Sequence, residues 1–238
     1  MTYTFDADSR RVKDASTTLD PNRPSIVFAG ESFMMGYKLP WEETIPGQVE
    51  AMTGLQSVNL AVEGYSNAQA FLRLKQQLPE FRQPIAVVFL FLPSVFRKDI
   101  DRTLPRLDPE LHLLQPEAPL RLTVLAHWLV PYESRRSITE GVVTAQHILR
   151  AVAEMAEARG AVPVTVVPDV ADKRAGERGV RRRVLDEAHL PYVPVPLQSQ
   201  WHVPNDEHPD ARADHAMAAA VVRALRTRCG PCVTRAGD

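Results

Sequence analysis

The chain has 238 residues, of which 45% are hydrophobic and 24% are charged, and its formal net charge is −1. This composition is typical of one large globular α/β domain, and the balanced charge does not favour a nucleic-acid partner. No run of about 18 apolar residues is present, so we expect no insertion into a membrane. The polar first residues lack the apolar segment of a signal peptide, and we therefore expect a cytoplasmic location.

Apolar segments alternate with segments of helical spacing along most of the chain. We expect a polar N-terminal arm over residues 1–23, one domain over 24–227 and a C-terminal tail over 228–238. The alternation predicts a mainly parallel sheet with helices on both faces. The expected strands are 25–29, 57–61, 85–92, 162–167 and 192–195, with 85–92 central and 192–195 at an edge. The expected helices are 43–53, 67–77, 137–159, 180–188 and 211–226.

Two segments fall outside this alternation. Residues 93–120 are rich in proline and irregular, and such a long loop is typical of a lid or a substrate wall. Cys229 and Cys232 stand in a CGPC string after the last expected helix, with no strand before it. We interpret this string as part of the tail, with thiols able to pair, in preference to a redox or metal site.

The first candidate for chemistry is Ser32, which follows the expected strand 25–29 through Gly30 and Glu31. A serine in this turn lies at the carboxyl edge of a parallel sheet, where ligands of α/β proteins bind. It also lies near a helix N-terminus, which stabilises developing negative charge. The alternative is that Ser32 only caps a helix.

The second candidate is His208, which precedes the last expected helix and follows Asp206 by two residues. A serine nucleophile needs a base and a group that orients this base, and His208 and Asp206 are suited to these roles. The alternative is a solvated acidic cluster at the start of a helix.

Taken together, four short blocks resemble those of the SGNH (GDSL-like) hydrolase superfamily over roughly residues 25 to 225. They correspond to the Gly-Asp-Ser block, the Asn-(Leu/Phe)-Gly-x-x-Gly-Tyr block, the Gly-x-Asn-Asp-like block and the Asp-x-(x)-His-Pro block. In this chain they read 30–36 (GESFMMG), 59–65 (NLAVEGY), 93–96 (PSVF) and 206–209 (DEHP). The resemblance implies a three-layer α/β/α sandwich with a mainly parallel, flavodoxin-like sheet of about five strands.

The resemblance also implies roles for individual residues. Ser32 would be the nucleophile, His208 the base and Asp206 the group that orients it. The backbone N–H groups of Ser32 and Gly64 would form part of the oxyanion hole. Tyr65 and Trp41 are candidates for contacts with the substrate.

The chain departs from the family pattern at several positions. Glu31 replaces the usual Asp, and we expect this change to shift the local geometry without loss of function. Ala61 replaces the first Gly of the second block, which is acceptable at negative φ. The Asn that donates to the oxyanion in the family aligns with Val95, which has no donor. We expect Ser94 or Arg97 to turn into the site in its place.

The spacing before His208 leaves two candidates for the orienting residue. Many family members have Asp three residues before the His, where this chain has Asn205, and others have it two residues before. We prefer Asp206, because a carboxylate stabilises an imidazolium and an amide does not.

The leading functional hypothesis is a serine esterase that acts on an O-acetyl or short acyl group of a carbohydrate or small molecule. The alternatives are an O-acyltransferase with the same site and a catalytically impaired binding domain, the latter because of Val95. The sequence has no HExxH, paired CxxC or phosphate-binding loop, so we expect no metal and no cofactor. The oligomeric state stays open.

Overall fold

The computed structural model describes residues 2–117, 134–170 and 175–230. Its centre is a seven-stranded sheet in the order β1-β2-β4-β3-β5-β8-β9. The five strands from β4 to β9 pair in parallel, whereas β1 and β2 are antiparallel additions at one edge. The strands are β1 (Thr4–Phe5), β2 (Arg11–Val12), β3 (Ser25–Ala29), β4 (Gln56–Asn59), β5 (Pro84–Leu90), β8 (Val162–Val170) and β9 (Val193–Leu197).

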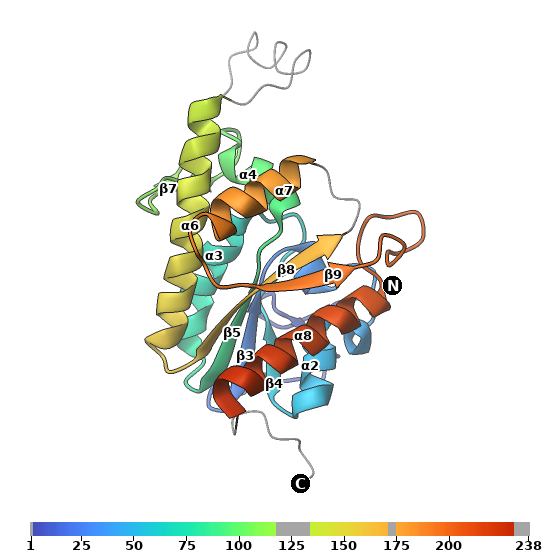
Figure 1. The fold of residues 1–238 in the computed structure, drawn as a ribbon. Helices are drawn as coiled ribbons and strands as arrows, with labels where there is room; N and C mark the ends of the chain where they lie inside the picture. The colour runs from blue at the N-terminus through green and yellow to red at the C-terminus, as the bar shows by residue number, and fades with distance from the viewer. Residues whose placement is uncertain (1, 118–133, 171–174, 231–238) are drawn as a thin grey trace.

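Helices cover both faces of this sheet, which confirms the predicted three-layer α/β/α sandwich (Figure 1). One face packs against α3 and α6, and the other packs against α2 and α8. The helices are α1 (Ser32–Met35), α2 (Ile45–Thr53), α3 (Asn67–Gln77), α4 (Phe96–Ile100), α6 (Arg135–Glu157), α7 (Ala175–Arg181) and α8 (Ala211–Cys229), with 3-10 turns η1 (Trp41–Glu43), η2 (Leu78–Glu80) and η3 (Pro93–Val95).

Side chains of the central strands alternate between the two faces of the sheet, and both faces are covered by helices and apolar. In β3, Val27 and Ala29 join the core under α3 and α6, while Ile26 and Phe28 join the core under α2 and α8. All four side chains are at most 1% exposed. A strand that is buried on both sides reads as a continuous apolar run, and the sequence showed this pattern for β3 and β5.

The expectation of about five strands is wrong by the two short strands of the N-terminal arm. Each has only two residues, too few for a periodic pattern, and their polar composition hides them. Arg11 of β2 is nevertheless buried, and its Nη1 donates to the carbonyl oxygens of Met35 and Gly36 at 2.6 Å each. Its Nη2 donates to the Leu39 carbonyl oxygen at 2.5 Å. The arm therefore holds the segment that follows α1.

Other differences from the expected elements are local. Residues 93–114 are not wholly irregular, because they contain η3, α4 and a hairpin of β6 (Arg106–Leu107) and β7 (Leu113–Leu114). The helix expected at 180–188 begins earlier as α7 and continues as the π-helix η4 (Arg182–Asp186). Helix α8 extends to Cys229, while residues 118–120 of the expected loop and Cys232 lie outside the described residues. No helix within the described residues is long and apolar enough to cross a bilayer.

Gly36 fixes the turn that follows α1, and we expect Gly36→Ala to unfold more easily. Its φ of 81° is left-handed, and an added Cβ would lie 2.2 Å from Thr44 Cγ2 and 2.8 Å from Arg11 Nη1. The left-handed backbone costs about 1–2 kcal/mol for a residue with a Cβ, and overpacking adds about 1–3 kcal/mol. Urea denaturation should therefore show that the free energy of unfolding falls by about 2 kcal/mol or more.

Gly160→Ala is the matched control, because Gly160 has a φ of 69° and nothing within 4 Å of an added Cβ. Its free energy of unfolding should fall only by the cost of the left-handed backbone, about 1–2 kcal/mol. Equal losses in the two variants would mean that the contacts with Thr44 and Arg11 do not constrain this turn.

Candidate active site

The two candidate blocks meet at the carboxyl edge of the sheet. Ser32 is the first residue of α1, just past the end of β3, and His208 lies in the loop between β9 and α8. The Nε2 atom of His208 lies 2.9 Å from Ser32 Oγ, although 176 positions separate the two residues in sequence. This is hydrogen-bond distance, so the geometry allows the imidazole to take the proton of the hydroxyl.

Asp206 completes a chain of hydrogen bonds with the same histidine. The Nδ1 atom of His208 lies 2.5 Å from Asp206 Oδ1, and the His208 backbone N–H donates to the same oxygen at 3.0 Å. An ionised carboxylate only accepts, so Nδ1 carries the proton and Nε2 is left to face Ser32. The carboxylate at this position belongs to Asp206, whereas the neighbouring Asn205 is exposed, with a left-handed φ of 60°.

Lys38 is a charged member of this site that the sequence analysis missed. Its Nζ donates to Asp206 Oδ2 at 2.6 Å, on the oxygen opposite His208. The hydrogen bond from Lys38, followed by those from His208, holds the pKa of Asp206 well below its ordinary value. Lys38 has a left-handed φ of 61° in the turn after α1. Only the fold of this turn brings it near Asp206, so no local motif could have shown it.

Two aromatic rings flank the imidazole. The Tyr37 ring centroid lies 4.4 Å from that of His208, and the Phe33 centroid lies 5.6 Å away, both in tilted arrangements. Both aromatic residues belong to the segment that carries Ser32. They limit the rotation of His208 and keep its Nε2 directed toward the hydroxyl.

Glu31 makes a contact that its alignment with an Asp did not predict. Its Oε2 lies 2.5 Å from Ser32 Oγ, and its Oε1 accepts from the Phe33 backbone N–H at 3.1 Å. The residue is only 4% exposed. Burial raises the pKa of Glu31, and this effect outweighs the hydrogen bonds from Ser32 and Phe33 that lower it. A buried carboxyl therefore touches the candidate nucleophile directly.

Gly64, a candidate oxyanion donor, is exposed with a φ of 81°. Its carbonyl oxygen, which belongs to the peptide group between Gly64 and Tyr65, accepts from Lys98 Nζ at 2.9 Å. Ser94 and Arg97 are both exposed, and neither hydrogen-bonds to Ser32 or His208 within the described part of the chain. The long side chain that reaches the second block is thus Lys98, one residue beyond Arg97.

The two aromatic candidates for substrate contacts differ in position. Tyr65 is half-buried beside Gly64, at the rim that carries the other candidates. Trp41 is buried and lines a cavity of about 60 Å³ with Glu50 and Ser57. Other residues of this cavity precede β3 or begin β4, at the end of the sheet away from Ser32. The position of Trp41 gives no support to a substrate contact.

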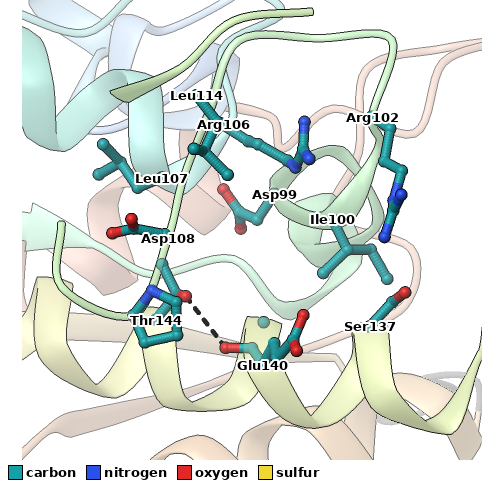
Figure 2. A pocket seen from close by; sticks show the side chains of 12 residues that line it. Asp99, Ile100, Arg102, Arg106, Leu107, Asp108, Leu114, Ser137, Glu140 and Thr144 are labelled. Atoms are coloured by element: carbon teal, nitrogen blue, oxygen red, sulfur yellow. Dashed lines mark hydrogen bonds between the residues drawn. The ribbon is translucent and has the colours of Figure 1, made fainter. Parts of the chain in front are cut away.

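A second cavity, of about 80 Å³, lies between α4, the β6–β7 hairpin and α6 (Figure 2). Asp99 lines it and is buried, with its pKa raised to about 6 by burial. Its carboxylate accepts from Asn67 Nδ2 at 2.7 Å and from the Ala68 backbone N–H at 2.9 Å, at the start of α3. The lining includes none of the hydrogen-bonded residues around Ser32. No group of three or more His, Cys, Asp or Glu side chains within the described ranges is placed to hold a metal ion.

Comparison with known proteins identifies the architecture. No protein-family model matches the chain, and no curated protein matches its sequence. A lipolytic protein of the G-D-S-L family from Desulfitobacterium hafniense DCB-2 is similar, with a TM-score of 0.54 at 14% identity over 84% of this chain and 98% of that chain.

Two carbohydrate esterases are similar to the same extent. An acetyl xylan esterase from the rumen bacterium Butyrivibrio proteoclasticus has a TM-score of 0.53 at 10% identity, over 90% of this chain and 66% of that one. A carbohydrate esterase whose active site is described as having divergent catalytic and non-catalytic binding functions has a TM-score of 0.55 at 12% identity, over 93% and 71%. The chain therefore has the fold of the G-D-S-L lipolytic proteins and of these carbohydrate esterases.

Proposed function

We propose that this protein is a serine esterase that removes an O-acetyl or short acyl group from a carbohydrate or small molecule. The observation that carries this proposal is the continuous hydrogen-bonded chain from Ser32 through His208 to Asp206, with contacts of 2.9 and 2.5 Å. A hydroxyl, an imidazole and a carboxylate in this order form the machinery of serine acyl transfer on unrelated folds. Geometry of this kind is stronger support for a function than fold alone.

The reaction follows from the positions of the three groups. Ser32 Oγ attacks the acyl carbon as His208 Nε2 takes its proton, and Asp206 stabilises the imidazolium that forms. When the tetrahedral intermediate collapses, His208 returns this proton to the leaving alcohol and an acyl-enzyme on Ser32 remains. Water then attacks the acyl carbon with the help of His208, which finally protonates Ser32 Oγ as the acid leaves.

The oxyanion needs donors that Val95 does not supply. In our proposal the backbone N–H groups of Ser32 and Gly64 face the oxyanion, while Lys98 contacts the next peptide group, between Gly64 and Tyr65, through the Gly64 carbonyl oxygen. Loss of one oxyanion donor costs about 10²–10³ in rate, so we expect a slower enzyme than one with all its donors.

Covalent labelling of the native protein tests the nucleophile. A fluorophosphonate should add one phosphonyl group per chain, on the peptide that contains Ser32. The rate of p-nitrophenyl acetate hydrolysis should fall in proportion to the fraction of chains that are labelled. Because labelling needs a serine activated by its base, urea-unfolded protein should not react. Acetate release from acetylated xylan then tests the substrate class, and transfer to an added sugar acceptor would identify an acyltransferase.

A second function, binding of a glycan without turnover, is favoured by Val95 alone. It predicts a folded protein that binds acetylated xylan in calorimetry but neither reacts with the phosphonate nor releases acetate. Phosphonate on Ser32 together with acetate release would exclude it.

A further inference from the structure

Ser32 Oγ has two polar neighbours that compete for its single proton. Glu31 Oε2 lies 2.5 Å away and His208 Nε2 lies 2.9 Å away. A hydroxyl donates one hydrogen bond and accepts others. The hydroxyl can therefore donate to only one of the two neighbours, and the protonation of Glu31 decides which.

An ionised Glu31 gives an unproductive arrangement. A carboxylate only accepts, so the hydroxyl proton would point toward Glu31 and away from the base. The negative charge would also lie next to the Oγ atom, where negative charge develops during attack. Both effects oppose the transfer of the proton to His208.

A protonated Glu31 gives a productive arrangement. Its O–H donates to Ser32 Oγ, the hydroxyl donates to His208 Nε2, and Nδ1–H of His208 donates to Asp206. All the bonds then run in one direction, with Asp206 as the final acceptor. Hydrogen bonds ordered in this way polarise one another and prepare the proton for transfer.

Burial of Glu31 favours its protonated form and outweighs the hydrogen bonds from Ser32 and the Phe33 N–H, which favour the ionised form. The side chain is 4% exposed, and burial is the main cause of its raised pKa. The charged or titratable groups that face it are His208, from the loop before α8, and the buried carboxyl of Asp214, from α8. The charge of His208 favours ionisation of Glu31, while Asp214 opposes it as a second carboxyl. No Lys or Arg is among the main influences on its ionisation.

We propose that Glu31 is a further catalytic residue, which acts as a neutral acid that donates a hydrogen bond to Ser32 Oγ and directs the hydroxyl proton to His208. This inference rests on the proposed esterase function. During deacylation the bond between the acyl carbon and Ser32 Oγ breaks, and His208 Nε2 transfers to Oγ the proton it took from water. The O–H of Glu31 stabilises the negative charge on Oγ while this bond breaks, and Glu31 keeps its own proton throughout.

The proposal predicts a particular pH dependence. Activity is present while Glu31 is protonated and is lost as the pH rises through the pKa of Glu31. The wild-type profile of kcat/KM should therefore have an alkaline limb that belongs to Glu31.

Glu31→Gln and Glu31→Ala distinguish the loss of a titrating group from the loss of the hydrogen-bond donor. Glutamine keeps an N–H donor at the same side-chain length and does not titrate, so Glu31→Gln should retain activity within about tenfold and lose the alkaline limb. Alanine removes the donor, and kcat should fall by about 10²–10³, the usual effect of losing one preorganised donor. Asp99→Asn is the matched control, since Asp99 is also buried with a raised pKa but lies apart from Ser32, and its profile should equal that of the wild type.

Two results would overturn the role of Glu31: an alkaline limb that persists in Glu31→Gln, or a loss in Glu31→Gln as large as that in Glu31→Ala. The second result would mean that the carboxylate itself is needed. Imidazole ¹⁵N shifts of His208 give a readout without turnover, because Nε2 should report the titration of Glu31 in the wild type and not in Glu31→Gln. If Ser32 fails to label and no ester is cleaved, the esterase proposal fails, while these shifts still decide whether Glu31 controls the Ser32 proton.

Discussion

Replacement of Ser32 by Ala is expected to lower kcat/KM for p-nitrophenyl acetate by about 10⁴-fold or more, the usual effect when a serine hydrolase loses its nucleophile. The variant keeps the backbone N–H groups at positions 32 and 64 but has no oxygen to form an acyl-enzyme. His208 Nε2 and Glu31 Oε2 also lose a partner at 2.9 and 2.5 Å. Any remaining hydrolysis would have to use water activated by His208, a slower reaction because water is not held in place.

The measurement is initial-rate hydrolysis with the spontaneous rate subtracted, together with circular dichroism to show that the variant is folded. Ser16→Ala is a suitable control, because Ser16 is exposed and its hydrogen bonds within the described residues go to Asp14, nearby in sequence. It should match the wild type. A Ser32→Ala protein that hydrolyses the ester at the wild-type rate would show that another residue is the nucleophile.

Much of the fold was predictable because its centre consists of strands buried on both sides. Residues 25–29 read as a continuous apolar run, and the structure has β3 at Ser25–Ala29. The predicted helix 67–77 matches α3 at Asn67–Gln77, where Ser66 forms a capping box with Gln69. Local patterns of this kind are visible in sequence because packing on one face or two determines them.

The N-terminal arm was not predictable in the same way. Its two-residue strands are too short to show a periodic pattern. The role of Arg11 depends on its hydrogen bonds to three carbonyl oxygens that are 24 to 28 positions away in sequence. Burial of an arginine is uncommon unless its donors are paired, and here the turn after α1 pairs Nη1 and Nη2. Only the folded structure shows that this turn needs a cation.

In the candidate site, too, some residues were predictable from the sequence and others were not. Ser32, Asp206 and His208 belong to recognisable blocks, and the structure brings them within hydrogen-bond distance of one another. Lys38 and Lys98 have no motif, because each acts through a contact with a distant segment. Glu31 was expected only to shift the local geometry, and its direct contact with Ser32 Oγ at 2.5 Å could not be read from the sequence.

Replacement of Asp206 by Asn is expected to lower kcat by about 10⁴-fold near neutral pH, although the fold should persist. The carboxylate holds the proton of His208 on Nδ1 through a contact of 2.5 Å, so that Nε2 is free to accept from Ser32. An amide can donate to Nδ1, which places the imidazole proton on Nε2, where it faces the hydroxyl and blocks transfer. The amide also gives up the charge that stabilises the imidazolium.

Two further variants, Lys38→Met and Glu207→Gln, serve as comparisons for Asp206→Asn. Lys38→Met removes the ammonium 2.6 Å from Asp206 Oδ2 but leaves the contact of Asp206 with His208. The pKa of Asp206 should then rise toward its ordinary value, but the carboxylate stays ionised near neutral pH, so the neutral rate should change by only about tenfold or less. Glu207→Gln removes an exposed neighbouring carboxylate and should change neither the rate nor the profile.

Steady-state kinetics of the three variants between pH 4 and 9 would distinguish orientation of the histidine from general electrostatics. If loss of negative charge alone were responsible, Glu207→Gln would also slow the reaction and Lys38→Met would speed it. A large loss confined to Asp206→Asn requires that the carboxylate act through its bond to Nδ1, because Asp206 and Glu207 are adjacent and equal in charge. A wild-type kcat in Asp206→Asn would instead show that His208 holds its tautomer without this carboxylate.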